Sequence, residues 1–402
     1  MMQRDIPLLT CGLDYYKLTM SQLQYEHHRH TQVTFALKHR GSGLLAQYVD
    51  AATLQIHLDA VRARGFVDSE LHYLAGLRSS SGQPIFAAMY LDYIATHPLP
   101  AVQVNICDGE LHIETTGAWP LVTFWETVVM SAVNQHYFAG YVAAHQLSLS
   151  DIYAEGQRRL DEKIAVLQHD ASIRIVDFGT RRHFGTAWQT HVVRQLQQRV
   201  PQNLLGTSNV HLAQSLNLRP IGTFAHEMPM VYAALADRRH GDVRASHQAF
   251  LHDWYARYGV DLAIALTDTF GSDFFFADFT LTQAQQWRGF RHDSGDPERF
   301  GERAIAFYAE RGIDPTTKTI VFSDGLDIAT IQRLHQRFAG RIQLVYGWGT
   351  NLTNDVGLKP LNIVMKTTSV AGAPAVKLSD HAGKHMGPAD KIAAYQQVFS
   401  VR

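Results

Sequence analysis

One pattern recurs along most of this chain: a short apolar segment ends in glycine, hydroxyl or charged residues, and a helical segment follows. Residues 222–227, with the sequence GTFAHE, are one example, because an apolar run ends there in a histidine and a glutamate. Repeated strand-then-helix units build parallel sheets and barrels, whose chemistry gathers at the carboxyl ends of the strands. The pattern therefore predicts where the functional side chains lie before it indicates what they do.

From about residue 170 this pattern predicts eight strands. We place them at 173–178, 203–206, 219–224, 262–267, 287–291, 319–323, 342–347 and 361–366. The clearest helices are 297–311, which Asp296 can cap, and 327–339, and each is followed by a glycine that can end it. Eight parallel strands with crossover helices would close a barrel. No clear helix follows 361–366, so we expect the barrel to be irregular.

The first third of the chain has a different pattern. Residues 13–28 predict an amphipathic helix, and 31–40 alternate as a half-buried strand does. Residues 101–116 predict a hairpin that turns at Asp108-Gly109. The predicted fold class is therefore α/β, with an α+β antiparallel-sheet domain over 1–135, completed by part of 367–402, and an irregular TIM-like α/β barrel over 136–366. We expect 370–390, rich in Gly, Lys and His, to form a functional loop or a return to the first domain.

Charge and composition exclude several classes of function. The 402 residues carry a formal net charge of −1, so no general basic field favours nucleic acid or an anionic membrane. The two cysteines, Cys11 and Cys107, imply no disulfide framework and favour a reducing cytoplasm. The N-terminus lacks the apolar core of a signal peptide, and no apolar run approaches the ~18 residues of a membrane span.

Two late strand ends have the composition of phosphate-binding loops. Ser323-Asp324-Gly325 follows one predicted strand, and Gly347, Gly349 and Thr350 follow the next. Backbone N–H groups at such turns and at helix starts attract anions, and barrels often hold phosphate at their last strands. Either motif alone would more often be an ordinary turn, but two on consecutive strands favour phosphate.

Carboxylates also cluster at the predicted strand ends. They are Asp268, Asp273, Asp293, Asp296 and Asp324. With phosphate they would hold Mg²⁺, which prefers oxygen ligands, and Asp268 and Asp324 are our candidates for that role. The alternative is that Asp273 and Asp296 only cap helices.

Cations and one histidine complete the predicted rim. Arg181, Arg182 and Arg291 can pair with carboxylate or phosphate, and an arginine near Phe178 would suit a flat anionic ring. A structural arginine–aspartate network is the alternative for any single one. His226 could be a structural residue, an acid or base, or a nucleophile toward a phosphoryl group.

Taken together, these segments resemble the nicotinate phosphoribosyltransferase family. The resemblance runs in order over nearly the whole chain, through residues 14–20, 178–182, 206–209, 225–227, 267–271, 291–297, 322–327 and 349–355. It implies a type II phosphoribosyltransferase fold, with an antiparallel-sheet domain and an irregular barrel. It also implies that nicotinate and 5-phosphoribosyl 1-diphosphate give nicotinate mononucleotide and diphosphate, the entry step of NAD salvage.

The resemblance also implies site roles and partners. ATP hydrolysis would be coupled through a phosphohistidine at His226, with Mg²⁺, and the subunits would form a homodimer with shared active sites. Phe178 would stack on the pyridine ring, the partner subunit's Tyr16 would cover the other face, and Arg181 would follow the stacking aromatic. Arg291 would lie near the nicotinate carboxylate and Asp293 would bind the ribose, while Gly325, Gly349 and Thr350 would bind phosphate.

Substrate choice is expected to depend on the end of the second predicted barrel strand, where Thr207 and Ser208 would contact substrate. Nicotinamide-specific relatives carry an aspartate at the place of Ser208, which would repel a carboxylate, so Ser208 favours nicotinate.

A nicotinamide-using enzyme remains an alternative, as does a catalytically silent barrel that binds pyridine nucleotides. A lyase or aldolase would need a Schiff-base lysine, for which Lys366 is the only strand-end candidate. We expect Phe178, His226, Arg291 and Gly325 to face one ligand.

Overall fold

A computed structural model describes residues 7–41 and 44–401 of the chain. Most of the N-terminal stretch that lacks a signal-like core lies outside these residues. The chain divides into two compact units: residues 1–172, 176–222 and 348–366 form unit 1, and residues 173–175, 223–347 and 367–402 form unit 2. The boundaries of these units differ from the predicted domain boundary near residue 135. That boundary stays a prediction.

Unit 1 is mainly helical. Its elements are η1 (Leu9–Gly12), α1 (Tyr15–His28), β1 (Gln32–His39), η2 (Leu45–Gln47), α2 (Ala51–Arg64), α3 (Asp68–Gly76), α4 (Ala88–Thr96), β2 (Val102–Cys107), β3 (Glu110–Ala118), α5 (Trp119–Val122), α6 (Trp125–Ala144), α7 (Leu149–His169), η3 (Thr180–Arg182), α8 (Thr186–Arg199), β5 (Leu204–Thr207), α9 (Val210–Ser215) and α16 (Thr350–Thr353).

Unit 2 alternates strands and helices. Its elements are α10 (Glu227–Arg238), α11 (Ala245–Tyr258), η4 (Gly259–Leu262), β6 (Ile264–Leu266), α12 (Ser272–Asp278), α13 (Leu281–Gln286), β7 (Gly289–His292), α14 (Pro297–Ala309), η5 (Pro315–Thr317), β8 (Thr319–Phe322), α15 (Ile328–Phe338), β11 (Ala373–Pro374), η6 (Ala382–Lys384) and α17 (Ala389–Val398). Three strands have residues in both units: β4 (Ile175–Asp177), β9 (Gln343–Trp348) and β10 (Ile363–Val370).

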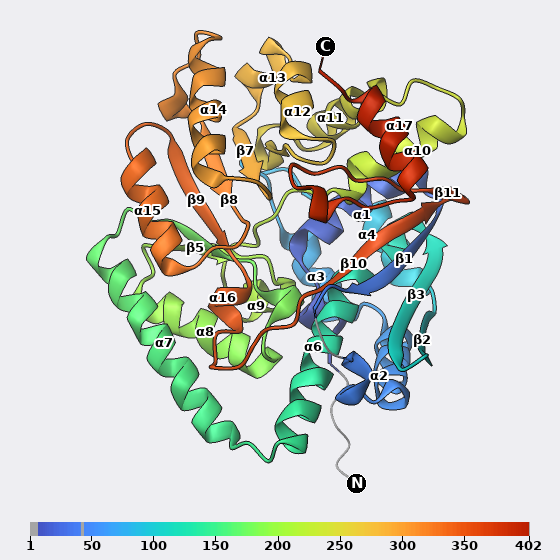
Figure 1. Ribbon diagram of the computed structural model, residues 1–402, viewed down its shortest axis with the longest axis vertical. Helices are drawn as coiled ribbons and strands as arrows, with labels where there is room; N and C mark the ends of the chain where they lie inside the picture. Colours follow the sequence, from blue (N-terminus) through green and yellow to red (C-terminus); the bar gives the residue numbers. More distant parts are fainter. Residues whose placement is uncertain (1–6, 42–43, 402) are drawn as a thin grey trace. The chain divides into compact units, whose positions relative to one another are not determined.

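The strands form the two kinds of sheet that the sequence predicts, which confirms the α/β fold class. One sheet has the order β11-β10-β1-β3-β2, and the other has the order β5-β4-β9-β8-β7-β6. In the first, β3 pairs antiparallel with both β1 and β2, and in the second, β6, β7, β8 and β9 pair in parallel. The parallel strands are short and buried, and α14 lies beside β7 and β8, as Figure 1 shows.

The local predictions in the first third are confirmed in position, but helix α1 is not amphipathic as predicted, because every residue from Tyr15 to Tyr25 is buried. Helix α1, strand β1 and the β2–β3 hairpin lie where the pattern placed them. At the hairpin turn, Asp108 and Gly109 have φ of 52° and 79°. Two consecutive residues with positive φ make the turn that fits the twist of paired strands, and the Asp-Gly pair tolerates it.

The two clearest helices in unit 2 are also confirmed. Asp296 caps α14 by accepting hydrogen bonds from the backbone N–H groups of Glu298, at 2.8 Å, and Arg299, at 3.1 Å. Gly312 and Gly340 follow α14 and α15 with φ of 68° and 77°, which a residue with a side chain rarely adopts. The alternative reading of Asp296 as a helix cap is therefore correct.

Two of the eight predicted barrel strands are wrong. Residues 361–366 contribute to β10, which belongs to the antiparallel sheet, because a buried apolar run alone does not specify its neighbours. Residues 219–224 form no regular strand; one parallel bridge joins Pro220 to Thr207. The barrel-like sheet is irregular at these places.

The segment 375–386 packs onto the strand ends within unit 2. The backbone N–H of Leu378 donates to the carbonyl of Thr269 at 2.9 Å, and Asp380 accepts from the backbone N–H of Ser272 at 2.6 Å. Helix α17 follows, and Phe399 stacks on Phe270 with ring centroids 3.9 Å apart. The predicted functional loop thus lies against the residues that follow β6.

The cysteines and the helices bear on the expectations about disulfides and membrane spans. Cys11 and Cys107 are both free thiols. Among the described helices, none is both long and apolar enough to cross a lipid bilayer.

Candidate active site

His226 lies at the centre of the charged cluster in unit 2. It stands immediately before α10, after the irregular segment that replaces the third predicted strand, and its side chain is buried. Its Nε2 lies 2.9 Å from Oδ2 of Asp293, and its Nδ1 lies 3.0 Å from Oγ1 of Thr269. Both ring nitrogens are therefore in hydrogen-bonding contact with side chains that follow β6 and β7.

The surroundings of His226 keep its imidazole neutral near pH 7. Burial lowers the pKa of His226 to about 4, and the charge of Lys377 acts in the same direction, against Asp268 and Asp293. Burial alone would raise the pKa of Asp293, but the hydrogen bond from His226 and the charge of Arg291 hold it well below its usual value. A neutral imidazole beside an ionised carboxylate donates its N–H to that carboxylate, which places the proton on Nε2 and the lone pair on Nδ1.

Asp268 is the second carboxylate of the cluster and is almost completely buried. Its Oδ2 accepts hydrogen bonds from the hydroxyls of Ser294 and Ser379. Its Oδ1 has no hydrogen-bond partner within the described residues and lies 3.7 Å from Nε2 of His226. One ligand atom from each of His226, Asp268 and Asp293 lies within 4.8 Å of the others, so this group is a candidate metal site.

The predicted phosphate segment after β8 reaches the same cluster. The hydroxyl of Ser323 donates to the carbonyl of His292 at 3.0 Å and to Oδ1 of Asp293 at 3.3 Å. Asp324 forms an ion pair with Lys384 at 2.8 Å. Gly325 has φ of 61°, is exposed, and would have open space around an added Cβ. Asp324 thus contacts a lysine, while Asp268 is the carboxylate that joins His226.

Arg291, on β7, is partly buried beside this cluster. Its Nε is a buried donor without a hydrogen-bond partner in the described part of the chain. Such a donor is costly unless a ligand or water satisfies it. The position agrees with a role in binding an anion.

Sequence reasoning did not name the lysines of the segment 375–386. Lys384 contacts Asp324 and also donates to the carbonyl of Asp293 at 3.1 Å. Lys377 is buried and lies close enough to His226 to lower its pKa. The only signal for them was the Gly-, Lys- and His-rich composition of 370–390.

Unit 1 holds the predicted ring-binding residues. Arg181 lies over the ring of Tyr16, with its guanidinium carbon 5.9 Å from the ring centroid. Its Nε lies 3.6 Å from Oδ2 of Asp14, and the hydroxyl of Ser208 donates to Oδ1 of the same carboxylate at 2.7 Å. Phe178 is partly exposed at the end of β4. Arg181 and Ser208 therefore both contact Asp14, and Tyr16 lies beside Arg181.

Three further predicted residues in this region have mainly structural contacts. Thr207 is fully buried and its hydroxyl donates to Asp177 at 2.7 Å. A Cβ on Gly349 would lie 3.3 Å from the carbonyl oxygen of Phe178, and Thr350 begins the one-turn helix α16. Gly347, in unit 2, is buried within β9. Phe178 lies in unit 1, whereas His226, Arg291 and Gly325 lie in unit 2, so their sharing one ligand stays a prediction.

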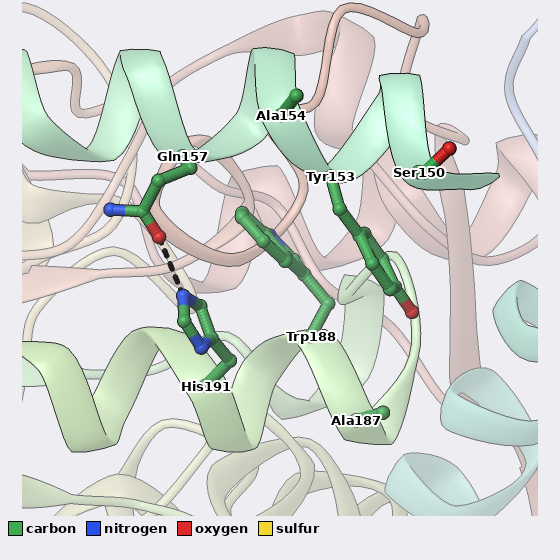
Figure 2. Close-up of a pocket in the computed structure, with 7 residues that line it drawn as sticks. All are labelled: Ser150, Tyr153, Ala154, Gln157, Ala187, Trp188 and His191. Carbon is green, nitrogen blue, oxygen red and sulfur yellow. Dashed lines mark hydrogen bonds between the residues drawn. The ribbon is translucent and has the colours of Figure 1, made fainter. Parts of the chain in front are cut away.

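A pocket of about 380 Å³ lies elsewhere in unit 1, between α7 and α8 (Figure 2). Tyr153 and Trp188 stack there with ring centroids 5.3 Å apart, and His191 is joined to Gln157 by a hydrogen bond of 2.6 Å. None of the predicted site residues lines this pocket. The chemistry described above therefore does not depend on it.

The fold and these clusters define an α/β protein with a histidine–carboxylate pair at the ends of parallel strands. The model of the nicotinate phosphoribosyltransferase (NAPRTase) family matches residues 173–402, and the model of the NAPRTase N-terminal domain matches residues 12–134. The chain belongs to the nicotinate phosphoribosyltransferase family.

Individual relatives agree with this membership. The nicotinate phosphoribosyltransferase of Cupriavidus necator is 40% identical over 97% of both chains, and that of Chromobacterium violaceum is 38% identical over 100% of this chain and 99% of its own. The crystal structure of nicotinate phosphoribosyltransferase from Vibrio cholerae has a TM-score of 0.86 at 32% identity, over 100% of this chain and 95% of that one. The structure from Porphyromonas gingivalis has a TM-score of 0.87 at 30% identity, over 98% and 100%.

Proposed function

We propose that this protein joins nicotinate to 5-phosphoribosyl 1-diphosphate, giving nicotinate mononucleotide and diphosphate, and that it couples this reaction to ATP hydrolysis through phosphorylation of His226. The family supports the transfer reaction. The observation that carries the coupling is the buried imidazole of His226, whose two ring nitrogens contact Asp293 and Thr269.

The contacts of His226 suit a nucleophile. With Nε2–H donated to Asp293, the lone pair of Nδ1 attacks the γ-phosphorus of ATP; an N–P bond forms, the bond to the bridging oxygen breaks, and ADP leaves. The positive charge that develops on the ring is stabilised by Asp293, as a carboxylate stabilises the imidazolium in serine hydrolases. The hydroxyl of Thr269, 3.0 Å from Nδ1, can then donate to a phosphoryl oxygen. Water later attacks phosphorus and breaks the N–P bond.

The transfer half of the reaction uses the other predicted residues. Phe178 and Tyr16 would hold the pyridine ring so that its nitrogen faces the anomeric carbon, which is an orientation effect. The bond from that carbon to diphosphate breaks as the bond to the ring nitrogen forms. Donors at Ser323, Gly325, Gly347, Gly349 and Thr350 would stabilise the departing diphosphate, and Arg291 would pair with an anionic group.

The residues present fit Mg²⁺, which the family reaction implies. The unsatisfied Oδ1 of Asp268 and the carboxylate of Asp293 are the hard oxygen donors that this ion prefers. The predicted ligand Asp324 is paired with Lys384 instead, so we propose Asp268 and Asp293 as the holding residues. When bound, the ion would neutralise charge on the substrate phosphates.

The coupling is tested by phosphate labelling. After incubation with ATP, mass spectrometry should find an acid-labile phosphate on His226, and His226→Ala should lose both the label and the stimulation of turnover by ATP. His247 provides a matched control, because it is also buried and lies 2.7 Å from a carboxylate, that of Asp278. His247→Ala should keep the label. An unlabelled wild-type protein, or a labelled His226→Ala protein, would contradict the coupling.

A homodimer with shared active sites is part of the same proposal. The partner subunit's Tyr16 would then cover the ring that Phe178 contacts. Light scattering during size exclusion should give the mass of two chains; a monomer that is fully active would remove this part of the proposal.

A further inference from the structure

Five charged side chains from distant parts of the chain meet in unit 1. Lys17 and Lys366 contact different oxygens of Glu126, at 2.5 and 2.8 Å. Arg181 lies between the two carboxylates, 3.7 Å from Glu126 and 3.6 Å from Asp14. We call Asp14, Lys17, Glu126, Arg181 and Lys366 the charge cluster.

The charge cluster is buried except at one end. The side chains of Lys17, Glu126 and Asp14 are 0%, 1% and 2% exposed, and that of Lys366 is 16% exposed. The side chain of Arg181 is 36% exposed. Burying ions is expensive unless they are paired, and Arg181 is the member that a solvent-borne ligand can reach.

The composition of the charge cluster matters because its members share a medium of low dielectric constant. Three cations and two carboxylates give it a formal charge of one positive. Burial would raise the pKa of Glu126, but Lys17, Lys366 and Arg181 hold it well below its usual value, so this carboxylate is ionised. Removal of one lysine would make the formal charge of the cluster zero. Removal of both would leave two carboxylates around one arginine, and this net negative charge would repel an anion.

The ring of Tyr16 lies beside two cations of the charge cluster. The ring centroid of Tyr16 lies 5.5 Å from Nζ of Lys17 and 5.9 Å from the guanidinium carbon of Arg181. The hydroxyl of Ser208 donates to the carboxylate of Asp14, which also contacts Arg181. Because a carboxylate is already present beside Ser208, the lack of an aspartate at 208 does not by itself explain a preference for an acid over an amide.

We propose that Lys17, Glu126 and Lys366 are positioning residues that set the charge around Arg181, so that the site selects a flat aromatic ring carrying one carboxylate over its neutral amide. The inference rests on the proposed function and names which buried residues give it its specificity. Glu126 fixes the three cations in place, and the two lysines offset its charge.

The test compares single and double charge variants in a double-mutant cycle, with the equilibrium Kd as the measured quantity. Calorimetry measures the Kd of nicotinate and of nicotinamide for wild type, Lys366→Met, Glu126→Gln and the double variant; Lys366→Gln serves if the Met variant does not fold. Lys366→Met should weaken nicotinate binding on the order of tenfold and change nicotinamide binding little, because one nearby charge in a partly buried site is lost. The double variant restores the formal charge and should recover most of the preference for nicotinate over nicotinamide. Lys366→Arg should keep that preference.

Arg158 and Glu162 supply the matched control, since they form an ion pair on the exposed face of α7. The same cycle there should leave both affinities unchanged. An unchanged preference in Lys366→Met, or a double variant no better than the single, would overturn the inference even if wild type turns over nicotinate. A wild-type protein that binds neither ring would overturn the proposed function as well.

Discussion

The hydrogen bond between Asp293 and His226 assigns different tasks to the two nitrogens of one ring. Because the carboxylate accepts from Nε2, the lone pair is left on Nδ1, where the hydroxyl of Thr269 lies 3.0 Å away. An amide in place of the carboxylate could donate to the ring and favour the other tautomer. In the proposed coupling, the identity of this one oxygen acceptor therefore decides whether His226 can act as the nucleophile.

Asp293→Asn should slow the phosphorylation of His226 by about two orders of magnitude or more, because the tautomer and the stabilising charge are both lost. Rapid-quench labelling with ATP measures the rate. Asp296→Asn is the control, since Asp296 only caps α14 and asparagine caps equally well. Equal labelling rates in Asp293→Asn and wild type would show that the carboxylate has no such role.

At the scale of elements, α7 and α8 pack closely because Gly156 lacks a side chain. An added Cβ would lie 2.6 Å from Cζ2 of Trp188 and 3.0 Å from a methyl of Val356. Gly156→Ala should therefore lower the free energy of unfolding by about 1–3 kcal/mol through overpacking. Urea denaturation measures it, and Gly76→Ala, at the end of α3 with open space around its Cβ, should cost nothing. A Gly156→Ala protein as stable as wild type would contradict the overpacking, because helix propensity alone favours alanine over glycine.

Elements were predicted well where the signal is local. The hairpin at Asp108-Gly109 and the cap at Asp296 depend on residues next to one another, and both are confirmed. Residues 361–366 were assigned to the wrong sheet, because their apolar run suits a buried strand in either one. The charge cluster escaped prediction because Lys17, Glu126 and Lys366 are far apart in sequence and each resembles an ordinary solvated charge.

At the scale of the whole molecule, buried histidines couple folding to pH. Burial lowers the pKa of His183 to about 4, whereas a histidine in the unfolded chain titrates near ~6.5. Between these values the unfolded chain binds a proton that the folded chain does not, so the free energy of unfolding falls as the pH decreases through this window. Below a pH of about 4 this contribution to the free energy of unfolding is completely lost.

His183→Gln should remove part of this acid sensitivity, on the order of 2 kcal/mol between pH 7 and 4.5. Urea unfolding at the two pH values measures the difference. His145→Gln, at an exposed position after α6, should keep the wild-type dependence. A His183→Gln protein that loses as much stability as wild type would contradict the assignment.

The family places this whole chain among nicotinate phosphoribosyltransferases, and the proposed reaction is tested most directly by its product. Wild-type protein is incubated with labelled nicotinate, 5-phosphoribosyl 1-diphosphate, Mg²⁺ and ATP, and the nucleotides are separated. We expect nicotinate mononucleotide to form over many turnovers, faster with ATP than without it. Bound nicotinate that is never converted would instead identify a pyridine-binding protein without catalysis and contradict the account.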